Sequence, residues 1–378
     1  MGSRPAMDVL GRTDEGDHVS HAAQTRQAGQ GGQTGQSGQK GQAGLARQTE
    51  RTGQLGRYLA TDGSLGAPVG VDVSRPHAGV VVGKRGSGKS YTLGVLAEAL
   101  GDAAGVSPVV VDPMGAFAGL AGAGLDVVEP RVRANALAPR AWCDLLDLDE
   151  TSAAGTLVWR AATEAGTLAE MRRLVEAASA DDSARRAASN HLALAASWGC
   201  FAAEAPRPRD LLADGAVLDC TRLQGAALQA VVAAVADDLY RAAVAGSERL
   251  PWLLVDESHA CATGAAADAI GTLYTRGRAP GASVVLATQR PSALPDVAVS
   301  QSDLLVAHRL PSRKDVDALA ATRPTYLAES LADQLPSRTG DALVVDDATE
   351  RTCTVRVRER RTEHHGGERV VDRREMTA

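Results

Sequence analysis

One short segment constrains the fold of this chain more than any other. Residues 83–90 read GKRGSGKS, which fits the pattern GxxxxGK[ST]. The β-branched run Val80–Val82 precedes the segment, and leucines at helical spacing follow it within Lys89–Leu100. A strand, a glycine-rich turn and a helix in this order predict a phosphate-binding loop. Backbone N–H groups of such a loop converge on phosphate oxygens at the positive end of the helix.

The residues of this loop have distinct expected roles. Lys89 should reach the β- and γ-phosphates, and the hydroxyl of Ser90 should hold Mg²⁺. Lysine is otherwise scarce, since the chain contains four lysines and two of them lie in this loop. ATP and Mg²⁺ are therefore the predicted cofactors. The residues expected to bind the nucleotide are Gly83, Arg85, Gly86, Ser87, Gly88, Lys89 and Ser90.

A second motif, WLLVDE at residues 252–257, ends an apolar run with two carboxylates. Asp256 is the expected second ligand of Mg²⁺, and Glu257 is expected to polarise an attacking water. Acidic residues also end many strands for structural reasons alone. The phosphate loop in the same chain favours the catalytic interpretation.

A third polar segment, TQRP at residues 288–291, follows the apolar run Ser283–Ala287. A polar side chain on the strand beside the one that carries Glu257 can sense the γ-phosphate. Gln289 is the first candidate for this role and Thr288 the second. An ordinary polar strand end remains the alternative.

Short apolar runs and longer helical patterns alternate along the chain, which predicts an α/β fold with a mostly parallel sheet covered on both faces. Two runs near the C-terminus predict a hairpin. The expected strands are 80–82, 108–111, 216–220, 251–255, 283–287 and 304–307, the helices 89–100, 223–245 and 265–274, and the hairpin strands 342–345 and 352–357.

Composition divides the chain into three parts. Residues 1–54 contain six triplets between positions 27 and 44, each of which begins with glutamine and ends with glycine, and are expected to form a disordered tail. Residues 55–350 are expected to form the P-loop ATPase domain, with an alanine-rich helical insertion at about 130–215. Residues 351–378 are expected to form a C-terminal strand and a basic tail.

Charge and hydropathy limit the functional classes. The formal net charge of −6 excludes a general basic coat for nucleic acid, although local basic sites remain possible. No uncharged stretch is long enough to span a bilayer, and the first residues lack the apolar core of a secretory signal. We therefore expect a cytoplasmic protein without a membrane partner.

Several motifs in order resemble the HerA–FtsK superfamily of ring-shaped ATPase motors, and HerA-like archaeal and bacterial ATPases most closely. The resemblance covers about residues 55–367. It rests on GKRGSGKS at 83–90, VVVDPMGAFAGL at 109–120, LLVDESH at 253–259, RGRAPGASVVLATQRPSALP at 276–295, SQSDLLVAHRL at 300–310 and TVRVRERRTEHHGG at 354–367.

This resemblance implies a RecA-like core and a homo-oligomer, usually a hexameric ring that threads DNA through its channel. It also implies an arginine that enters the nucleotide site of the neighbouring subunit. Arg278 is the candidate for that arginine, with Arg276 and Arg309 as alternatives. HerA proteins carry an N-terminal β-barrel that docks a nuclease, but only residues 55–82 precede the loop here, which argues against the usual nuclease partner.

The leading functional prediction is an ATP-hydrolysing DNA translocase or helicase-like motor. The alternatives are an ATPase that drives protein assembly or secretion, and a nucleotide-dependent switch, neither of which needs nucleic acid. Glu257 argues against a switch, which has no need of a polarising carboxylate. Expected DNA contacts are confined to loops near Arg131, Arg133 and Arg140 or near Arg172 and Arg173. His364 and His365 are interpreted as a solvated pair in the tail rather than as metal ligands.

Overall fold

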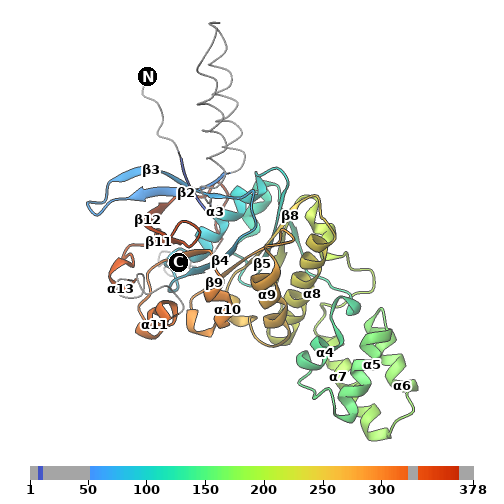
Figure 1. The fold of residues 1–378 in the computed structure, drawn as a ribbon. Coiled ribbons are helices and arrows are strands. Elements are labelled where there is room, and N and C mark those ends of the chain that lie inside the picture. The colour runs from blue at the N-terminus through green and yellow to red at the C-terminus, as the bar shows by residue number, and fades with distance from the viewer. Residues whose placement is uncertain (1–6, 12–51, 322–330, 366–378) are drawn as a thin grey trace, which may run out of the picture.

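A computed structural model describes residues 7–11, 52–321 and 331–365 of the chain. The described strands form one sheet in the order β1-β3-β2-β12-β11-β10-β4-β9-β8-β5-β7-β6 (Figure 1). The strands are β1 (Asp8–Leu10), β2 (Thr52–Leu59), β3 (Leu65–Asp72), β4 (Ala78–Val82), β5 (Val106–Asp112), β6 (Asp126–Val128), β7 (Ala216–Asp219), β8 (Leu250–Val255), β9 (Ser283–Thr288), β10 (Leu304–Ala307), β11 (Asp341–Asp346) and β12 (Arg351–Val357).

The sheet has a parallel part and an antiparallel part. From β10 through β4, β9, β8, β5 and β7 to β6, every neighbouring pair is parallel. Strands β11, β12, β2 and β3 continue the sheet with antiparallel pairs. This arrangement confirms the predicted α/β class with a mostly parallel sheet and the predicted hairpin near the C-terminus. The carboxyl ends of the parallel strands lie along one edge, where such sheets bind their ligands.

Helices cover both faces of the parallel part, and apolar side chains fill both interfaces. Along β8, Leu253 and Val255 belong to one buried cluster, whereas Trp252 and Leu254 belong to the other. This alternation follows from the two-residue period of a strand. The helices are α3 (Lys89–Gly101), α4 (Pro139–Leu145), α5 (Ala153–Glu164), α6 (Leu168–Ala177), α7 (Asp182–Ser197), α8 (Gly225–Val244), α9 (Gly264–Arg276), α10 (Asp296–Ser300), α11 (Arg313–Ala321) and α13 (Leu331–Gln334).

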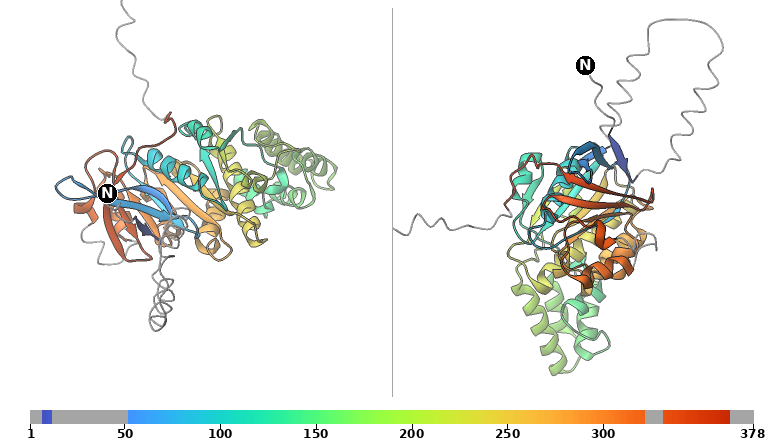
Figure 2. Two further views of the ribbon diagram at one scale, coloured as in Figure 1. Left: turned by 90° about the horizontal axis from the view of Figure 1, so that it is seen from above. Right: turned by 90° about the vertical axis from the view of Figure 1, so that its left-hand side faces the viewer.

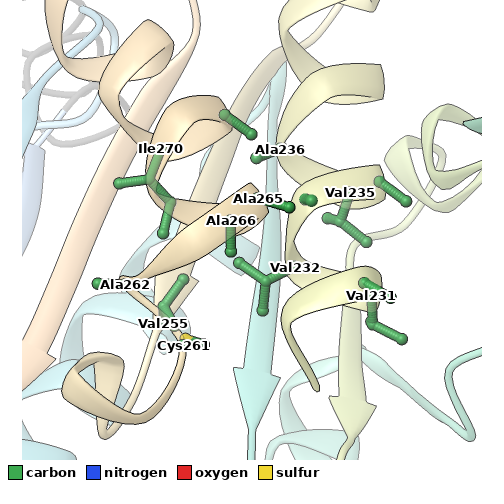
Figure 3. Close-up of a cluster of buried hydrophobic side chains, with 14 of the residues drawn as sticks. Val231, Val232, Val235, Ala236, Val255, Cys261, Ala262, Ala265, Ala266 and Ile270 are labelled. Carbon is green, nitrogen blue, oxygen red and sulfur yellow. The ribbon is translucent and has the colours of Figure 1, made fainter. Parts of the chain in front are cut away.

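Small side chains bring α8 and α9 close together on one face of the sheet. Ala236 of α8 and Ala266 of α9 are fully buried, as are Val232 and the nearby Ile270 (Figure 3). Helix α3 contributes to the cluster on the opposite face through residues such as Leu93. The strand that carries the two carboxylates is therefore held rigidly between two packed layers.

Helices α4 to α7 form a lobe at the end of the molecule remote from β2 and β3 (Figures 1 and 2). Local capping explains where two of these helices begin. The Ser152 hydroxyl accepts a hydrogen bond from the N–H of Gly155 before α5. Thr167 and Glu170 form a reciprocal capping box before α6. The lobe has its own buried residues, such as Met171.

Part of the predicted N-terminal tail belongs to the sheet, contrary to the sequence-based expectation. We placed residues 1–54 outside the folded domain, but Asp8–Leu10 form β1, which pairs in parallel with β3. Leu10 is 4% exposed, and the Gly11 N–H donates a 2.8 Å hydrogen bond to Asp346. These contacts join positions distant in sequence, so no local pattern could predict them. The glycine-rich triplets lie outside the described residues.

None of the helices in the described part of the chain combines the length and apolar composition that crossing a bilayer requires.

Candidate nucleotide-binding site

The phosphate loop connects β4 to α3 at the carboxyl edge of the sheet. The Gly83 N–H donates to the Thr288 carbonyl at 3.3 Å, and the Lys84 N–H donates to the Arg309 carbonyl at 2.8 Å. Gly86 and Gly88 have φ values of +73° and +117°, which side chains rarely tolerate. The loop is therefore tied to the strands on both sides of β4 and has a curl that requires glycine.

The close approach of neighbouring groups explains the glycine at position 83. A Cβ atom at Gly83 would lie 2.4 Å from the Ser87 hydroxyl oxygen and 2.6 Å from the His308 Cβ. The Ser87 hydroxyl in turn donates to the Lys84 carbonyl at 2.7 Å. A side chain at position 83 would displace both neighbours and open the loop.

Lys89 is almost enclosed but has no close ion pair among the described residues. Its side chain is 4% exposed, and its ammonium lies 3.5 Å from the Lys84 carbonyl and 4.0 Å from a Glu257 carboxylate oxygen. A buried ammonium with only distant partners is costly in the absence of an anion. The site thus fits a phosphate group that would complete the coordination of Lys89.

Ser90 and Asp256 meet across the site, as the Mg²⁺ prediction requires. The Ser90 hydroxyl donates to Asp256 Oδ2 at 2.7 Å, and the Glu257 N–H donates to Oδ1 at 2.9 Å. Burial raises the pKa of Asp256 to about 6, although the Ser90 hydrogen bond and Lys89 act in the opposite direction. Both groups are hard oxygen donors, the type that Mg²⁺ prefers together with phosphate oxygens and water.

No group of three or more His, Cys, Asp or Glu side chains in the described part of the chain has a metal-binding arrangement. One hydroxyl and one carboxylate suit Mg²⁺, which usually keeps several waters and binds the substrate phosphates. The donor set of Ser90 and Asp256 therefore fits magnesium rather than a metal held wholly by protein ligands.

Glu257 directly follows Asp256 and has an unusual backbone conformation. Its φ and ψ are 45° and 40°, the left-handed region that non-glycine residues rarely occupy. Its side chain is 18% exposed and lies 3.2 Å from His259 Nδ1. That contact lacks hydrogen-bond geometry, so the buried Oε2 has no hydrogen-bond partner among the described residues. The oxygen is available to accept a proton from a bound water.

His259 connects the Glu257 region to the neighbouring strand. Its Nδ1 lies 3.4 Å from the Thr288 hydroxyl at the end of β9. Burial lowers the pKa of His259, while Glu257 partly opposes this effect and Arg290 adds to it. A neutral imidazole thus lies between the proposed base and the sensor strand. Sequence analysis did not assign this residue, although it lies within the quoted LLVDESH motif.

The two sensor candidates have different surroundings. Thr288 is fully buried and its carbonyl accepts from Gly83 in the phosphate loop. Gln289 follows it and is half-buried. Its side chain makes no hydrogen bond to another residue in the described ranges. Thr288 therefore has the direct connection to the loop, and Gln289 lies beside it at the same edge of the sheet.

Two of the three candidate arginines lie near the amino edge of the sheet, and the third lies beside the phosphate loop. Arg278 precedes β9 at the amino edge, is 55% exposed and lies 3.8 Å from Asp303. Arg276 is the last residue of α9, near the same edge. Arg309 follows β10 and contacts the phosphate loop through its carbonyl. Arg278 therefore does not approach the phosphate loop of its own subunit.

His308 supports the phosphate loop and was not identified from sequence. It is fully buried, and its Nδ1 contacts the Asp341 carbonyl at 2.9 Å while Nε2 contacts the Thr92 hydroxyl at 2.9 Å. Burial lowers its pKa to about 4. A neutral ring with Nδ1 protonated satisfies both partners, since Nδ1 donates and Nε2 accepts. His308 thus joins β10, β11 and α3 behind the loop.

The motif VVVDPMGAFAGL positions another part of the site. Asp112 ends β5, and its carboxylate accepts hydrogen bonds from the N–H groups of Met114, Ala116 and Phe117 at 2.8 to 3.2 Å. Burial raises the pKa of Asp112, and these hydrogen bonds partly offset the effect. The turn after β5 is therefore fixed beside the phosphate loop.

The C-terminal segment Arg358–His365 lies against α3 instead of extending into solvent. Glu98 of α3 is fully buried and accepts hydrogen bonds from the N–H groups of Arg361 and Thr362, each at 2.9 Å. Arg358 adds a charged hydrogen bond of 2.7 Å to the same carboxylate. The interpretation of His364 as a solvated tail residue is wrong, because the ring is half-buried against Tyr91.

A pocket of about 590 Å³ unites these elements. Lys89, Ser90 and Glu257 lie along one part of it, and Tyr91 and His364 lie along another. Its volume is within the range of small-molecule sites. The structure therefore brings the predicted phosphate, metal and base residues into one pocket and adds a wall that the sequence did not predict.

Comparisons with known proteins show what the chain resembles in sequence and in fold. Residues 54–198 match the family model described as the central domain of helicase HerA. VirB4 of Thermoanaerobacter pseudethanolicus shares the fold with a TM-score of 0.63 and 16% identity, covering 81% of this chain and 96% of that one. The bacterial conjugative coupling protein TrwBΔN70 has a TM-score of 0.54 and 15% identity, covering 85% and 93%.

No curated protein matches the chain in sequence. The structural matches have low identity and show a shared P-loop NTPase fold. The family match covers the phosphate loop, the turn after β5 and the lobe of helices α4 to α7. Residues 54–198 are therefore similar to the central domain of helicase HerA, and the described fold is that of a P-loop NTPase.

Proposed function

We propose that this protein is an ATP-hydrolysing motor. The observation that carries the proposal is the hydrogen bond between Ser90 and Asp256 beside the contact between Lys89 and Glu257. Phosphate-binding, metal-binding and base groups thus meet in one pocket. A module that only binds nucleotide would not need Glu257 held in a strained conformation with an unpartnered oxygen.

Each residue of the site has a defined part in the proposed reaction. The loop N–H groups and Lys89 would hold the phosphates, and Ser90 and Asp256 would hold Mg²⁺, which supplies charge neutralisation when bound. Glu257 Oε2 would orient the attacking water and take its proton. Thr288 and Gln289 would report the presence of the γ-phosphate to β9.

We further propose that the active form is a ring in which Arg278 completes the site of a neighbour. Phosphoryl transfer commonly needs a positive charge near the γ-phosphate, and an arginine in trans can accelerate hydrolysis by roughly 10³-fold or more. Arg278 is exposed at the edge opposite its own phosphate loop, which supports this role. The ring size stays a prediction, with a hexamer expected from the superfamily.

We propose DNA as the polymer on which the motor acts, in agreement with the HerA helicase family to which it is similar. Of the arginines expected to contact DNA, Arg131 and Arg173 have acidic neighbours within the chain, at 3.3 Å and 3.7 Å. Arg140 and Arg172 are exposed and are the better candidates.

The proposal is tested by the rate of ATP hydrolysis with no polymer, with single-stranded DNA and with double-stranded DNA. We expect Mg²⁺-dependent hydrolysis that at least one form of DNA stimulates. Hydrolysis that neither form changes would reject DNA as the substrate and favour the alternative of an ATPase for protein assembly or secretion. Absence of hydrolysis despite ATP binding would instead favour a switch.

A further inference from the structure

The nucleotide pocket extends well beyond the phosphate loop. Away from Lys89, its lining comes from Tyr91 of α3 and from the segment Val357–His365. The phosphates of a nucleotide need only the loop and its neighbours. The remaining part of the pocket is therefore available to a group attached to the phosphates.

Two aromatic rings meet edge to face in this part of the pocket. The centres of the Tyr91 and His364 rings are 5.6 Å apart, with an angle of 80° between their planes. Neither ring is fully buried, so both retain exposed surface. Aromatic side chains of this kind offer flat surfaces on which any nucleobase can stack.

The protonation state of the His364 ring suits contact with a nucleobase. Its Nδ1 lies 3.0 Å from an Arg360 guanidinium nitrogen, which can only donate, so Nδ1 accepts and Nε2 carries the proton. Burial and the charge of Arg360 lower the pKa of His364. The ring is therefore neutral near pH 7 and keeps one N–H for a ligand.

The wall that carries His364 is firmly attached to the helix of the phosphate loop. The buried Glu98 carboxylate binds the N–H groups of Arg361 and Thr362. The Arg360 N–H donates to the Tyr91 hydroxyl at 2.6 Å, and the Arg360 side chain is 1% exposed over the Phe117 ring. The positions of Tyr91 and His364 are thus fixed relative to the phosphates.

From this arrangement we propose that Tyr91 and His364 bind the nucleobase, and that Arg358–His365 forms the base-binding wall of the pocket. The inference rests on the proposed function, because the loop must hold the phosphates of the same ligand. It assigns to the C-terminal segment a direct part in nucleotide affinity. The ligand class is a nucleoside triphosphate with a stacked base, rather than an inorganic polyphosphate.

The first test compares ATP with inorganic tripolyphosphate in the unaltered full chain, both with Mg²⁺. Stacking is worth roughly one tenfold step in affinity or more. We therefore expect ATP to bind at least about tenfold more tightly than tripolyphosphate. Equal affinities would overturn the proposal without any need for a variant.

The second test uses His364→Ala, with His364→Phe to restore a ring and His191→Ala as a control in helix α7 of the remote lobe. We expect His364→Ala to weaken ATP binding roughly tenfold and to leave tripolyphosphate binding unchanged. His364→Phe should restore ATP affinity to within about twofold, and His191→Ala should match the parent. Unchanged ATP affinity in His364→Ala, or an equal loss for both ligands, would overturn the proposal.

Failure of this inference is distinguishable from failure of the proposed function. Lys89→Ala should weaken ATP and tripolyphosphate alike, because it removes a phosphate contact. If that variant behaves as expected while His364→Ala has no effect, the phosphate site remains and the base-binding wall is rejected. If Lys89→Ala changes neither ligand, the phosphate site itself is rejected.

Discussion

The Ser90 hydroxyl donates a 2.7 Å hydrogen bond to the Asp256 carboxylate, which joins the first turn of α3 to the end of β8. The two residues are 166 positions apart in the chain. Both are oxygen donors at the edge where the phosphate loop lies. This contact holds together the two sequence motifs on which the nucleotide site depends.

Asp256→Asn should weaken Mg²⁺-dependent nucleotide binding, because the amide removes the negative charge that attracts the cation. Burial raises the pKa of Asp256 to about 6, so the carboxyl group is protonated below that pH. Mg²⁺-nucleotide affinity of the parent should therefore fall as the pH decreases through about 6. Titrations of Mg²⁺-ATP at a series of pH values measure both effects.

The γ-phosphate of ATP also titrates at about pH 6. The Mg²⁺-ATP affinity of Asp256→Asn, measured over the same pH values, therefore shows how much of the change comes from the ligand alone. The parent should lose more affinity than the variant over the same pH interval. Parallel profiles would show that Asp256 does not titrate in this interval, and equal Mg²⁺-ATP affinities of parent and variant at pH 7 would show that it does not bind the cation.

His308→Ala should destabilise the fold by roughly 2–4 kcal/mol, because it creates a cavity and leaves two buried groups without partners. The lowered pKa of His308 means that the unfolded chain binds more protons than the folded one between about pH 6.5 and 4. Its contribution to stability is therefore lost as the pH decreases through this interval. Urea unfolding at pH 7 and pH 5 measures this effect. Between the two pH values, the free energy of unfolding should decrease less in the variant than in the parent.

Glu98→Ala should destabilise the fold by about 3–5 kcal/mol, because it leaves buried donors and the nearly buried Arg360 without their carboxylate. Asp102→Ala is the matched control, since Asp102 also binds Arg361 but is 56% exposed. The control should change stability by less than about 1 kcal/mol. Chemical denaturation measures the free energy of unfolding of both variants. Equal losses would show that the buried Glu98 carboxylate stabilises the fold no more than the exposed Asp102 does.

Arg278→Ala should bind ATP as the parent does but hydrolyse it roughly 10³-fold more slowly, because a neighbouring site loses its positive charge. Arg313→Ala, at a 94% exposed arginine of α11, is the control and should retain most activity. Binding titrations and phosphate release provide the two readouts. Normal hydrolysis by Arg278→Ala alone would reject the assignment.

A mixing experiment separates action in trans from action within one subunit. Glu257→Gln and Arg278→Ala are each expected to be inactive. When they are mixed, some interfaces pair an intact Glu257 with an intact Arg278, and partial activity should return. Full activity of the parent in a dilute monomeric sample would contradict the requirement for a neighbour.

Much of the parallel core was predictable from sequence because its strands are continuous apolar runs. Leu304–Ala307 was predicted with the bounds that the structure shows, and Ser283–Ala287 to within one residue. The loop motif also predicted that Lys89 and Ser90 face a common site. These features depend on residues that are close together in the chain.

The parts that sequence analysis missed depend on contacts between distant positions. His308 faces α3 and β11, Glu98 binds residues more than 250 positions away, and β1 pairs with β3. No spacing pattern marks such residues. Glu98 occurs in a helix where an acidic side chain usually faces water, and only the tertiary structure shows that it is buried.

Glu257 is the proposed base of an ATP-hydrolysing site built on the phosphate loop. The most direct measurement is the steady-state release of phosphate from Mg²⁺-ATP by the parent and by Glu257→Gln, with ATP binding measured for both. We expect equal binding and a decrease in the hydrolysis rate of roughly 10²-fold or more in the variant. Equal rates of hydrolysis, or no binding of ATP by the parent, would contradict the account.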